Sequence, residues 1–288
     1  MKIKTVIPWQ VKIISKLVLS RIPSGYRFWQ RLGLFKHGYM EQPAYAYNVF
    51  KNHYDRVNFS RKGKGFVALE LGPGDSLFSA LICYAFGASA SYLIDTGRFA
   101  RNDLIPYRLM MNYLLEQGHK IPDVAEINSL NDMLTICGSL YGTKGVNSLQ
   151  AIPSETVDFV WSQAVLEHVR RHEFPDTMRE LRRVLRPDGV CSHRIDLKDH
   201  LGGALNNLRF SRDLWESDLM THSGFYTNRI RYPESLKLFR DGGFSVEIVK
   251  IDYWDKLPTP VNKLSMEFRH FKEDELRVSG LDVILRPK

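Results

Sequence analysis

The chain has 288 residues, of which 44% are hydrophobic and 25% charged, a composition typical of a soluble globular protein. It contains no apolar run near the roughly 20 residues that a membrane-spanning helix needs, and its three widely spaced cysteines argue against a disulfide framework or a zinc site. Residues 1–40 carry eight Lys or Arg and no acid, so the net charge of +8 resides there and the rest balances at 32 basic and 32 acidic residues. Because a nucleic-acid reader spreads its basic residues over the reading domain, we expect no nucleic-acid partner. The widely spaced cysteines fit a reducing compartment, so we expect a cytoplasmic protein.

The first predicted element is a basic amphipathic helix over residues 5–22, within an N-terminal arm of residues 1–60. Apolar side chains recur there at helical spacing, with two lysines opposite them. Those apolar positions are Ile7, Val11, Ile14 and Val18. Two hypotheses remain open: the helix packs on the domain, or residues 1–40 contact the inner face of a membrane peripherally.

From residue 65 onward, predicted strands alternate with predicted helices, which is typical of a parallel sheet covered on both faces. The strands are expected at residues 66–71, 90–95, 157–162, 189–195, 244–251 and 281–286, with a further one near 146–150. The helices are expected at residues 76–86, 102–118, 173–186 and 233–241. We therefore predict an α/β, Rossmann-like, doubly wound and mostly parallel seven-stranded sheet over residues 61–288, with a lid insertion at 198–238.

The loop after the first strand, within the stretch ALELGPGDSL (residues 68–77), has two glycines flanking a proline. In an open parallel sheet, ligands bind beyond the carboxyl ends of the strands at the topological switch point. Gly72 and Gly74 leave backbone for a ligand to approach, and Pro73 stiffens the turn. The position where a dinucleotide fingerprint needs its third glycine is Leu77, and no phosphate-loop lysine follows.

The stretch resembles the first motif of the class I S-adenosylmethionine-dependent methyltransferases, an acid followed by G-x-G-x-G. The resemblance implies S-adenosylmethionine as cofactor, bound by Glu70, Gly72, Pro73, Gly74 and Ser76, with Ser76 replacing the last glycine. In the family an acid that ends the second strand holds both ribose hydroxyls. Asp95, in SYLIDTG and 25 residues after Glu70, matches that position.

Residues 154–169 (SETVDFVWSQAVLEHV) resemble the fourth-strand region of the small-molecule, type 11-like branch of the superfamily. The resemblance covers about residues 66–196 and implies that Ser162 and Gln163 face the methionine end of the cofactor. The family places an acid or small polar residue after the third strand to hold the adenine amino group. Asn147 or Ser148 would take that role here.

The resemblance thus implies an enzyme that transfers a methyl group to a small-molecule or glycan acceptor, with oxygen as the expected target and polysaccharide biosynthesis as an expected setting. The alternative is a catalytically inactive methyltransferase fold that acts as a cofactor sensor or partner subunit, since a fold alone proves no chemistry.

A hydroxyl acceptor needs a general base, for which histidine is well suited. The predicted catalytic residues are His168 after the fourth strand, and His193, Asp196 and His200 around the fifth. Asp196, Asp199 and His200 have a spacing that would place them on one side of a turn. Substrate binding or base catalysis, a surface ion-pair cluster and a divalent metal site are the three hypotheses for that group, and we expect no metal.

The lid insertion mixes aromatic residues with amides and arginines, a combination suited to stacking on a ring and hydrogen-bonding its substituents. The predicted acceptor-binding residues are Trp215, Tyr226, Asn228 and Arg229. The alternative is that Trp215 belongs to the buried face of an amphipathic helix.

Overall fold

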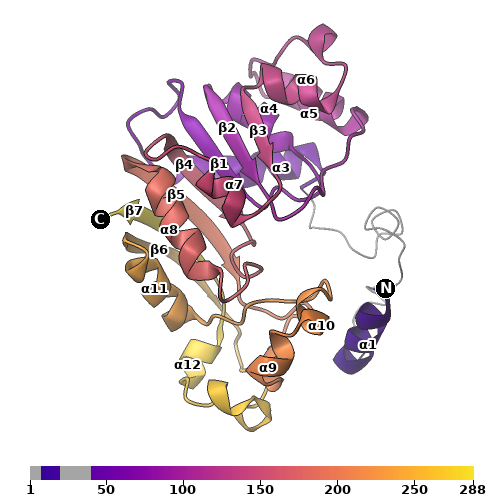
Figure 1. Cartoon of the computed structure of the whole chain (residues 1–288), viewed down its shortest axis with the longest axis vertical. Coiled ribbons are helices and arrows are strands. Elements are labelled where there is room, and N and C mark those ends of the chain that lie inside the picture. Colours follow the sequence, from indigo (N-terminus) through magenta and orange to yellow (C-terminus); the bar gives the residue numbers. More distant parts are fainter. Residues whose placement is uncertain (1–7, 20–39) are drawn as a thin grey trace.

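The computed structural model describes residues 8–19 and 40–288, and these form a seven-stranded sheet with strand order β3-β2-β1-β4-β5-β7-β6 (Figure 1). The strands are β1 (Val67–Leu71), β2 (Ala90–Ile94), β3 (Ser139–Gly142), β4 (Val157–Gln163), β5 (Leu185–Asp196), β6 (Phe244–Tyr253) and β7 (Val278–Pro287). β1 to β5 pair in parallel, and β7 runs antiparallel between β5 and β6. The predicted fold class and mostly parallel sheet are confirmed, with the switch point between β1 and β4.

Helices cover both faces of the sheet, and each face has its own hydrophobic cluster. The helices of the first face are α3 (Pro43–Asp55), α4 (Phe78–Ala85), α5 (Ile105–Glu116) and α6 (Leu130–Ile136). Those of the second face are α7 (Val146–Gln150), α8 (Phe174–Val184) and α11 (Tyr232–Asp241). The alternation along β4 shows how one strand serves both clusters, because Phe159 and Trp161 pack in the first and Val160 in the second.

One expectation about local structure is wrong. The third strand lies at residues 139–142, and the segment 146–150 that we expected to be this strand is α7. Within the predicted arm of residues 1–60, α3 packs into the core of the sheet domain, where Phe50 is fully buried. The apolar positions of α3 recur at helical spacing, which lets a helix before the first strand cover the sheet.

The lid insertion contributes short helices beyond one end of the sheet (Figure 1). They are α9 (Arg212–Trp215) and α10 (Asp218–Thr221), and a further short helix, α12 (Glu273–Leu276), precedes β7. The N-terminal helix α1 (Trp9–Leu19) packs against this insertion. Ile13 is buried in one cluster with Trp215, and the ring centroids of Trp9 and Phe210 are 6.0 Å apart.

The face of α1 that packs is not the predicted apolar stripe. Trp9, Ile13 and Leu17 contact the lid insertion, whereas Val11 and Ile14 are 48% and 63% exposed. Residues 1–7 and 20–39, including Ile7 of the predicted stripe, lie outside the described residues, and so does the side chain of Val18, the last residue of that stripe. Among the described helices, none has the length and apolar character that crossing a membrane requires.

Candidate active site

The loop between β1 and α4 has both of its glycines in the left-handed region, with φ of +67° at Gly72 and +68° at Gly74. The backbone N–H of Gly72 donates to the carbonyl of Ile94 at 2.8 Å, which joins the ends of β1 and β2. A Cβ on Gly72 would lie 2.6 Å from both Cγ atoms of Val165. Glycine is therefore required here by its φ and by the close approach of the segment that follows β4.

Asp95, directly after β2, joins the carboxyl ends of three strands. Its Oδ2 accepts a hydrogen bond from the backbone N–H of Gly74 at 3.0 Å, and its Oδ1 accepts one from Thr96 at 2.7 Å. Its backbone carbonyl accepts a hydrogen bond from Gly145, in the turn after β3, at 2.9 Å. The half-buried Asp95 carboxylate thus lies against the glycine loop, at the switch point where the sequence predicted a cofactor-binding acid.

Glu70 lies beneath this loop in β1 and is only 3% exposed. Burial raises the pKa of its carboxyl group to about 8; a hydrogen bond from Ser79 partly offsets this effect and the charge of Asp95 adds to it. Glu70 is therefore largely protonated at neutral pH. Ser76 ends the loop, and its hydroxyl donates to the carbonyl of Met40 at 2.9 Å, which ties the loop to the segment before α3.

The two residues predicted to hold adenine lie in α7 rather than directly after a strand. Asn147 is exposed, and Ser148 Oγ accepts a hydrogen bond from the backbone N–H of Lys144 at 3.0 Å. Because β3 ends at Gly142, the position that follows the third strand is Thr143. The adenine contact of Asn147 or Ser148 stays a prediction.

Ser162 and His193 are opposite each other on β4 and β5, and both are fully buried. Ser162 Oγ lies 2.7 Å from His193 Nδ1. Burial, together with the charge of Arg56, lowers the pKa of His193 to about 3, so its ring is neutral. His193 is inside the sheet rather than at the exit of β5, because it lies three residues before the end of the strand. The cofactor contact of Ser162 and the catalytic role of His193 stay predictions.

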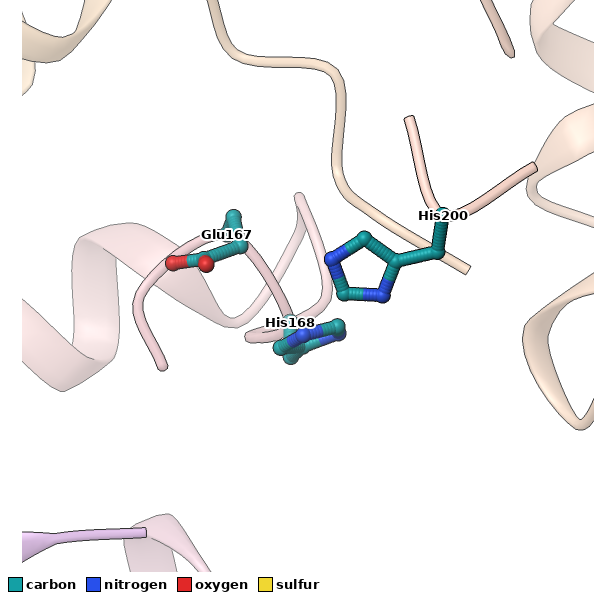
Figure 2. A group of neighbouring side chains, drawn as sticks. All are labelled: Glu167, His168 and His200. Atoms are coloured by element: carbon teal, nitrogen blue, oxygen red, sulfur yellow. The ribbon is translucent and has the colours of Figure 1, made fainter. Parts of the chain in front are cut away.

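Glu167, His168 and His200 come together at the carboxyl ends of β4 and β5 (Figure 2). One ligand atom from each side chain lies within 4.8 Å of those of the other two, and the two imidazole centroids are 4.8 Å apart. Burial raises the pKa of Glu167 to about 8, although backbone N–H groups of Glu167 and Asp196 offset part of this shift. Two of the predicted catalytic histidines thus share one site, together with a carboxyl group that the sequence argument did not single out.

The predicted grouping of Asp196, Asp199 and His200 does not form. Asp199 is buried and serves as the anchor of its own loop, because its carboxylate accepts hydrogen bonds from the backbone N–H groups of residues 201–204 and from both nitrogens of Asn206. Asp196 accepts a hydrogen bond from the backbone N–H of Lys198 at 3.0 Å. The carboxylates of Asp196 and Asp199 therefore bind different backbone groups.

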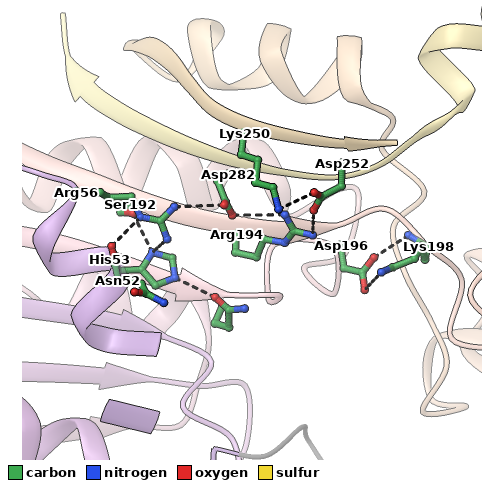
Figure 3. Close-up of polar contacts among 11 residues, drawn as sticks. Asn52, His53, Arg56, Ser192, Arg194, Asp196, Lys198, Lys250, Asp252 and Asp282 are labelled. Atoms are coloured by element: carbon green, nitrogen blue, oxygen red, sulfur yellow. Dashed lines mark hydrogen bonds and ion pairs between the residues drawn. The ribbon is translucent and has the colours of Figure 1, made fainter. Parts of the chain in front are cut away.

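His53 of α3 lies on the face of the sheet that α3, α4, α5 and α6 cover, and it links the end of β4 to the interior of β5 (Figure 3). Its Nε2 lies 3.0 Å from Gln163 Oε1, and its Nδ1 lies 2.8 Å from Ser192 Oγ. An amide oxygen can only accept, so Nε2 carries the proton and Nδ1 accepts from the hydroxyl. Burial and the charge of Arg56 lower the pKa of His53 to about 3, which keeps the ring neutral.

A polar pocket of about 470 Å³ opens beside this histidine. It is lined by Val49, Asn52, Arg56, Gln163, Arg194, Lys250, Asp252 and Asp282. Its charges are paired: Arg194 contacts Asp252 at 2.6 Å, Lys250 contacts the same carboxylate at 2.8 Å, and Arg56 contacts Asp282 at 3.5 Å (Figure 3). Three cations against two acids leave the pocket with one excess positive charge.

A smaller cavity of about 260 Å³ adjoins the glycine loop. Asp75 and Ser76 of the loop line it, together with Tyr107 of α5 and Glu41, which forms an ion pair with Arg101 at 3.4 Å. The loop thus has an open space on the side toward α3 and α5.

The four predicted acceptor-binding residues make contacts within the lid insertion or with the turn after β4. Trp215 is fully buried and donates from Nε1 to the carbonyl of Thr227, and Tyr226 donates to Glu216. Asn228 donates to the carbonyls of Leu166 and Val169, and Arg229 donates to that of Phe210 at 2.7 Å. The alternative that Trp215 belongs to a buried face describes the structure, and an acceptor contact by these four side chains stays a prediction.

Three residues near the site, His53, Arg56 and Glu167, were not among those that the sequence predicted. His53 had a detectable signal, because Ala46, Val49 and Phe50 precede it at helical spacing and put a histidine on the buried face of α3. Glu167 was visible only as part of the Leu-Glu-His-Val match. The residues next to Glu167 in the sequence do not show whether its carboxyl group is buried without a partner or exposed to solvent.

Comparison with known proteins gives a family match for one segment and solved structures that align over most of the chain. Residues 109–192 match the family model described as "Methyltransferase domain". A search of curated proteins gave no match. Among solved structures, a chain of the Haloferax volcanii complex between the Trm112 methyltransferase activator and a protein described as a methyltransferase aligns with a TM-score of 0.48 at 14% identity, over 92% of this chain and 99% of that one.

Two further structures are similar in the same degree. A SAM-dependent methyltransferase from Archaeoglobus fulgidus has a TM-score of 0.46 at 12% identity, over 91% of this chain and 98% of its own. An S-adenosylmethionine-dependent methyltransferase from Mesorhizobium loti has a TM-score of 0.42 at 16% identity, over 77% and 91%. All three TM-scores are below 0.5, so the weight rests on the family match and on the strand order of the chain itself.

Proposed function

We propose that this chain, a member of the class I S-adenosylmethionine-dependent methyltransferase superfamily by its strand order and by its family match over residues 109–192, transfers a methyl group to a hydroxyl oxygen of a small-molecule or glycan acceptor. One observation carries the proposal. The Asp95 carboxylate lies against the Gly74 backbone at the switch point of the sheet, where parallel α/β sheets bind ligands.

The residues at this point fit S-adenosylmethionine. Asp95 offers two carboxylate oxygens, each of which accepts a hydrogen bond from a backbone N–H group, and two oxygens suit a pair of neighbouring ribose hydroxyls. The glycine loop brings its backbone to the same place, and the 260 Å³ cavity lined by Asp75 and Ser76 adjoins it. When bound, the cofactor supplies a methyl group that is already activated by its sulfonium, so the protein has chiefly to align and shield it.

We assign the acceptor to the polar pocket beside Gln163. Since His53 Nε2–H occupies the Oε1 atom of Gln163, the NH₂ end of this amide is the end that can donate to a ligand. The excess positive charge of the pocket favours an acceptor that carries an anionic or strongly polar group. His168 is the proposed base, because it is exposed at the end of β4 and its Nδ1 contacts the Tyr226 carbonyl, which leaves the lone pair on Nε2.

A glycan precursor carried on a lipid is our proposal for the acceptor class, supported by the basic residues of the first 40 positions. This would place the chain at the inner face of a membrane. Deletion of residues 1–40 should then abolish binding to anionic vesicles, and undiminished binding would remove this part of the proposal.

Calorimetric titration with S-adenosylmethionine and with its demethylated product tests the cofactor site directly. We expect both to bind with 1:1 stoichiometry. A screen for demethylated product across sugar, quinone and phenol acceptors then tests the transfer. Tight binding without turnover on any acceptor would favour the non-catalytic sensor, and failure to bind either compound would refute the proposal.

A further inference from the structure

Two imidazoles and a carboxyl group meet at the carboxyl ends of β4 and β5 (Figure 2). Glu167 and His168 are adjacent in the turn after β4, and His200 lies in the loop after β5. Their ligand atoms lie within 4.8 Å of one another. A transition-metal ion bound at about 2.1 Å to each ligand holds opposite donor atoms at most about 4.2 Å apart, so a small rotation of the histidine rings closes the group around an ion.

Glu167 supplies the observation that points to a ligand. Its side chain is buried, at 3% exposure, and neither carboxylate oxygen makes a hydrogen bond of regular geometry with residues 8–19 and 40–288, although the backbone N–H groups of Glu167 and Asp196 lie close enough to lower its pKa. Buried polar atoms are nearly always satisfied, and each exception calls for a cause such as a bound ion. The Glu167 carboxyl group also lies within reach of both histidine rings. A cation at the centre of the three groups would satisfy it.

His168 has the support that metal-binding histidines usually have. Its Nδ1 lies 2.9 Å from the backbone carbonyl of Tyr226. A carbonyl can only accept, so Nδ1 carries the proton and the lone pair is on Nε2. Histidine ligands commonly donate their other ring N–H to a carbonyl or carboxylate in this way, which fixes the tautomer and the ring orientation. The carbonyl comes from the lid insertion, which is itself fastened to the turn by a 2.7 Å hydrogen bond from Asn228 N–H to the Glu167 carbonyl.

We propose that Glu167, His168 and His200 bind one divalent transition-metal ion of the class that includes Zn²⁺, Mn²⁺ and Fe²⁺. Two imidazoles and one carboxylate suit these ions and leave coordination positions open for further ligands. If the proposed function holds, an acceptor hydroxyl would occupy an open position and become a stronger acid through the bound cation, and His168, with its Nε2 on the metal, would be a ligand in place of the base proposed above. That role rests on the proposed function, whereas metal binding itself does not.

The test is a titration of the full-length, tag-free protein with Zn²⁺ and Co²⁺, followed by calorimetry and by the visible absorption of bound Co²⁺. The variants are Glu167→Gln and His200→Asn. His172→Asn is the matched control, because it removes an imidazole that is 69% exposed near the start of α8. We expect one equivalent of metal in the wild-type protein and in the control. Since loss of a residue that only supports a ligand weakens metal binding about 10- to 100-fold, loss of a ligand should weaken it at least as much.

Circular dichroism and thermal unfolding of each variant show whether it folds. If Glu167→Gln does not fold, His200→Asn alone tests the proposal. Saturable binding that is equal in the wild-type protein and both ligand variants would overturn the proposal, as would the absence of any stoichiometric site in the wild-type protein. Titration of the same samples with S-adenosylmethionine separates this inference from the proposed function. Metal binding without cofactor binding would support the metal site and refute the methyltransferase proposal. Cofactor binding without metal binding would support the methyltransferase proposal and refute the metal site.

Discussion

Replacement of Gly72 by Ala should destabilise the fold through two separable effects. The backbone at Gly72 has φ of +67°, and holding an L-residue in the left-handed region costs about 1 to 2 kcal/mol. The new Cβ would also lie 2.6 Å from both Cγ atoms of Val165, where ordinary contacts are 3.4 to 4 Å. Overpacking of this kind adds about 1 to 3 kcal/mol, so we expect a total loss of about 2 to 5 kcal/mol in the free energy of unfolding.

Gly118→Ala is the control, because Gly118 has φ of +79° but a Cβ there would meet no described atom within 4 Å. It should cost only the backbone part. Urea unfolding followed by circular dichroism gives both values, and Gly72→Ala repeated in a Val165→Ala background should recover most of the difference between them. Equal costs for the two glycine substitutions, or a Gly72→Ala cost that Val165→Ala leaves unchanged, would show that the glycine loop and the β4 exit do not interlock as described.

Asp95→Asn should weaken S-adenosylmethionine binding about 10- to 100-fold by calorimetry, because hydrogen bonds to a charged group contribute roughly 1.5 to 3 kcal/mol; unchanged affinity would place the ribose elsewhere. His193 has a pKa of about 3 in the folded protein, against 6.5 for the free side chain. Between these two pH values the unfolded state binds one more proton than the folded state, so stability is lost as the pH falls through that window. The variant His193→Asn should therefore show a less steep loss of stability in acid. The pKa of Glu70 shifts in the opposite direction, to about 8 in the folded protein against 4.5 for the free side chain, so stability is lost as the pH rises from 4.5 to 8. If the unfolding free energy of Glu70→Gln declines over this pH range as much as that of the wild-type protein, the assignment is wrong. Asp199→Ala removes the acceptor of six hydrogen bonds and should lower stability by about 2 to 4 kcal/mol in thermal unfolding, whereas Asp196→Ala, which loses only contacts to Lys198, should cost less than about 1 kcal/mol.

Local patterns in the sequence sufficed for most of the fold. The apolar strands that end in polar turns, and the helices that end at Arg-Pro-Asp-Gly and Asp-Gly-Gly, are set by interactions within a few residues, so periodicity and turn chemistry predict them. The edge strand β3 was not predicted, because its local pattern is weak. It has only four residues and leaves Leu140 53% exposed, so its sequence carries little of the alternation of a half-buried strand.

The glycine loop and Asp95 could likewise be found from sequence, because the carboxyl ends of parallel strands share one edge of a sheet and polar residues there converge whatever the details of packing. Contacts between residues far apart in the chain determine which ionisable groups are buried. His53 bonds to Ser192 across 139 positions of the chain, His193 is neutral because it lies inside the sheet, and Glu167 meets His200 only when the turn after β4 and the loop after β5 are folded together. The pKa of a side chain depends on the solvent and charges that surround it in three dimensions, and only the tertiary structure determines those surroundings.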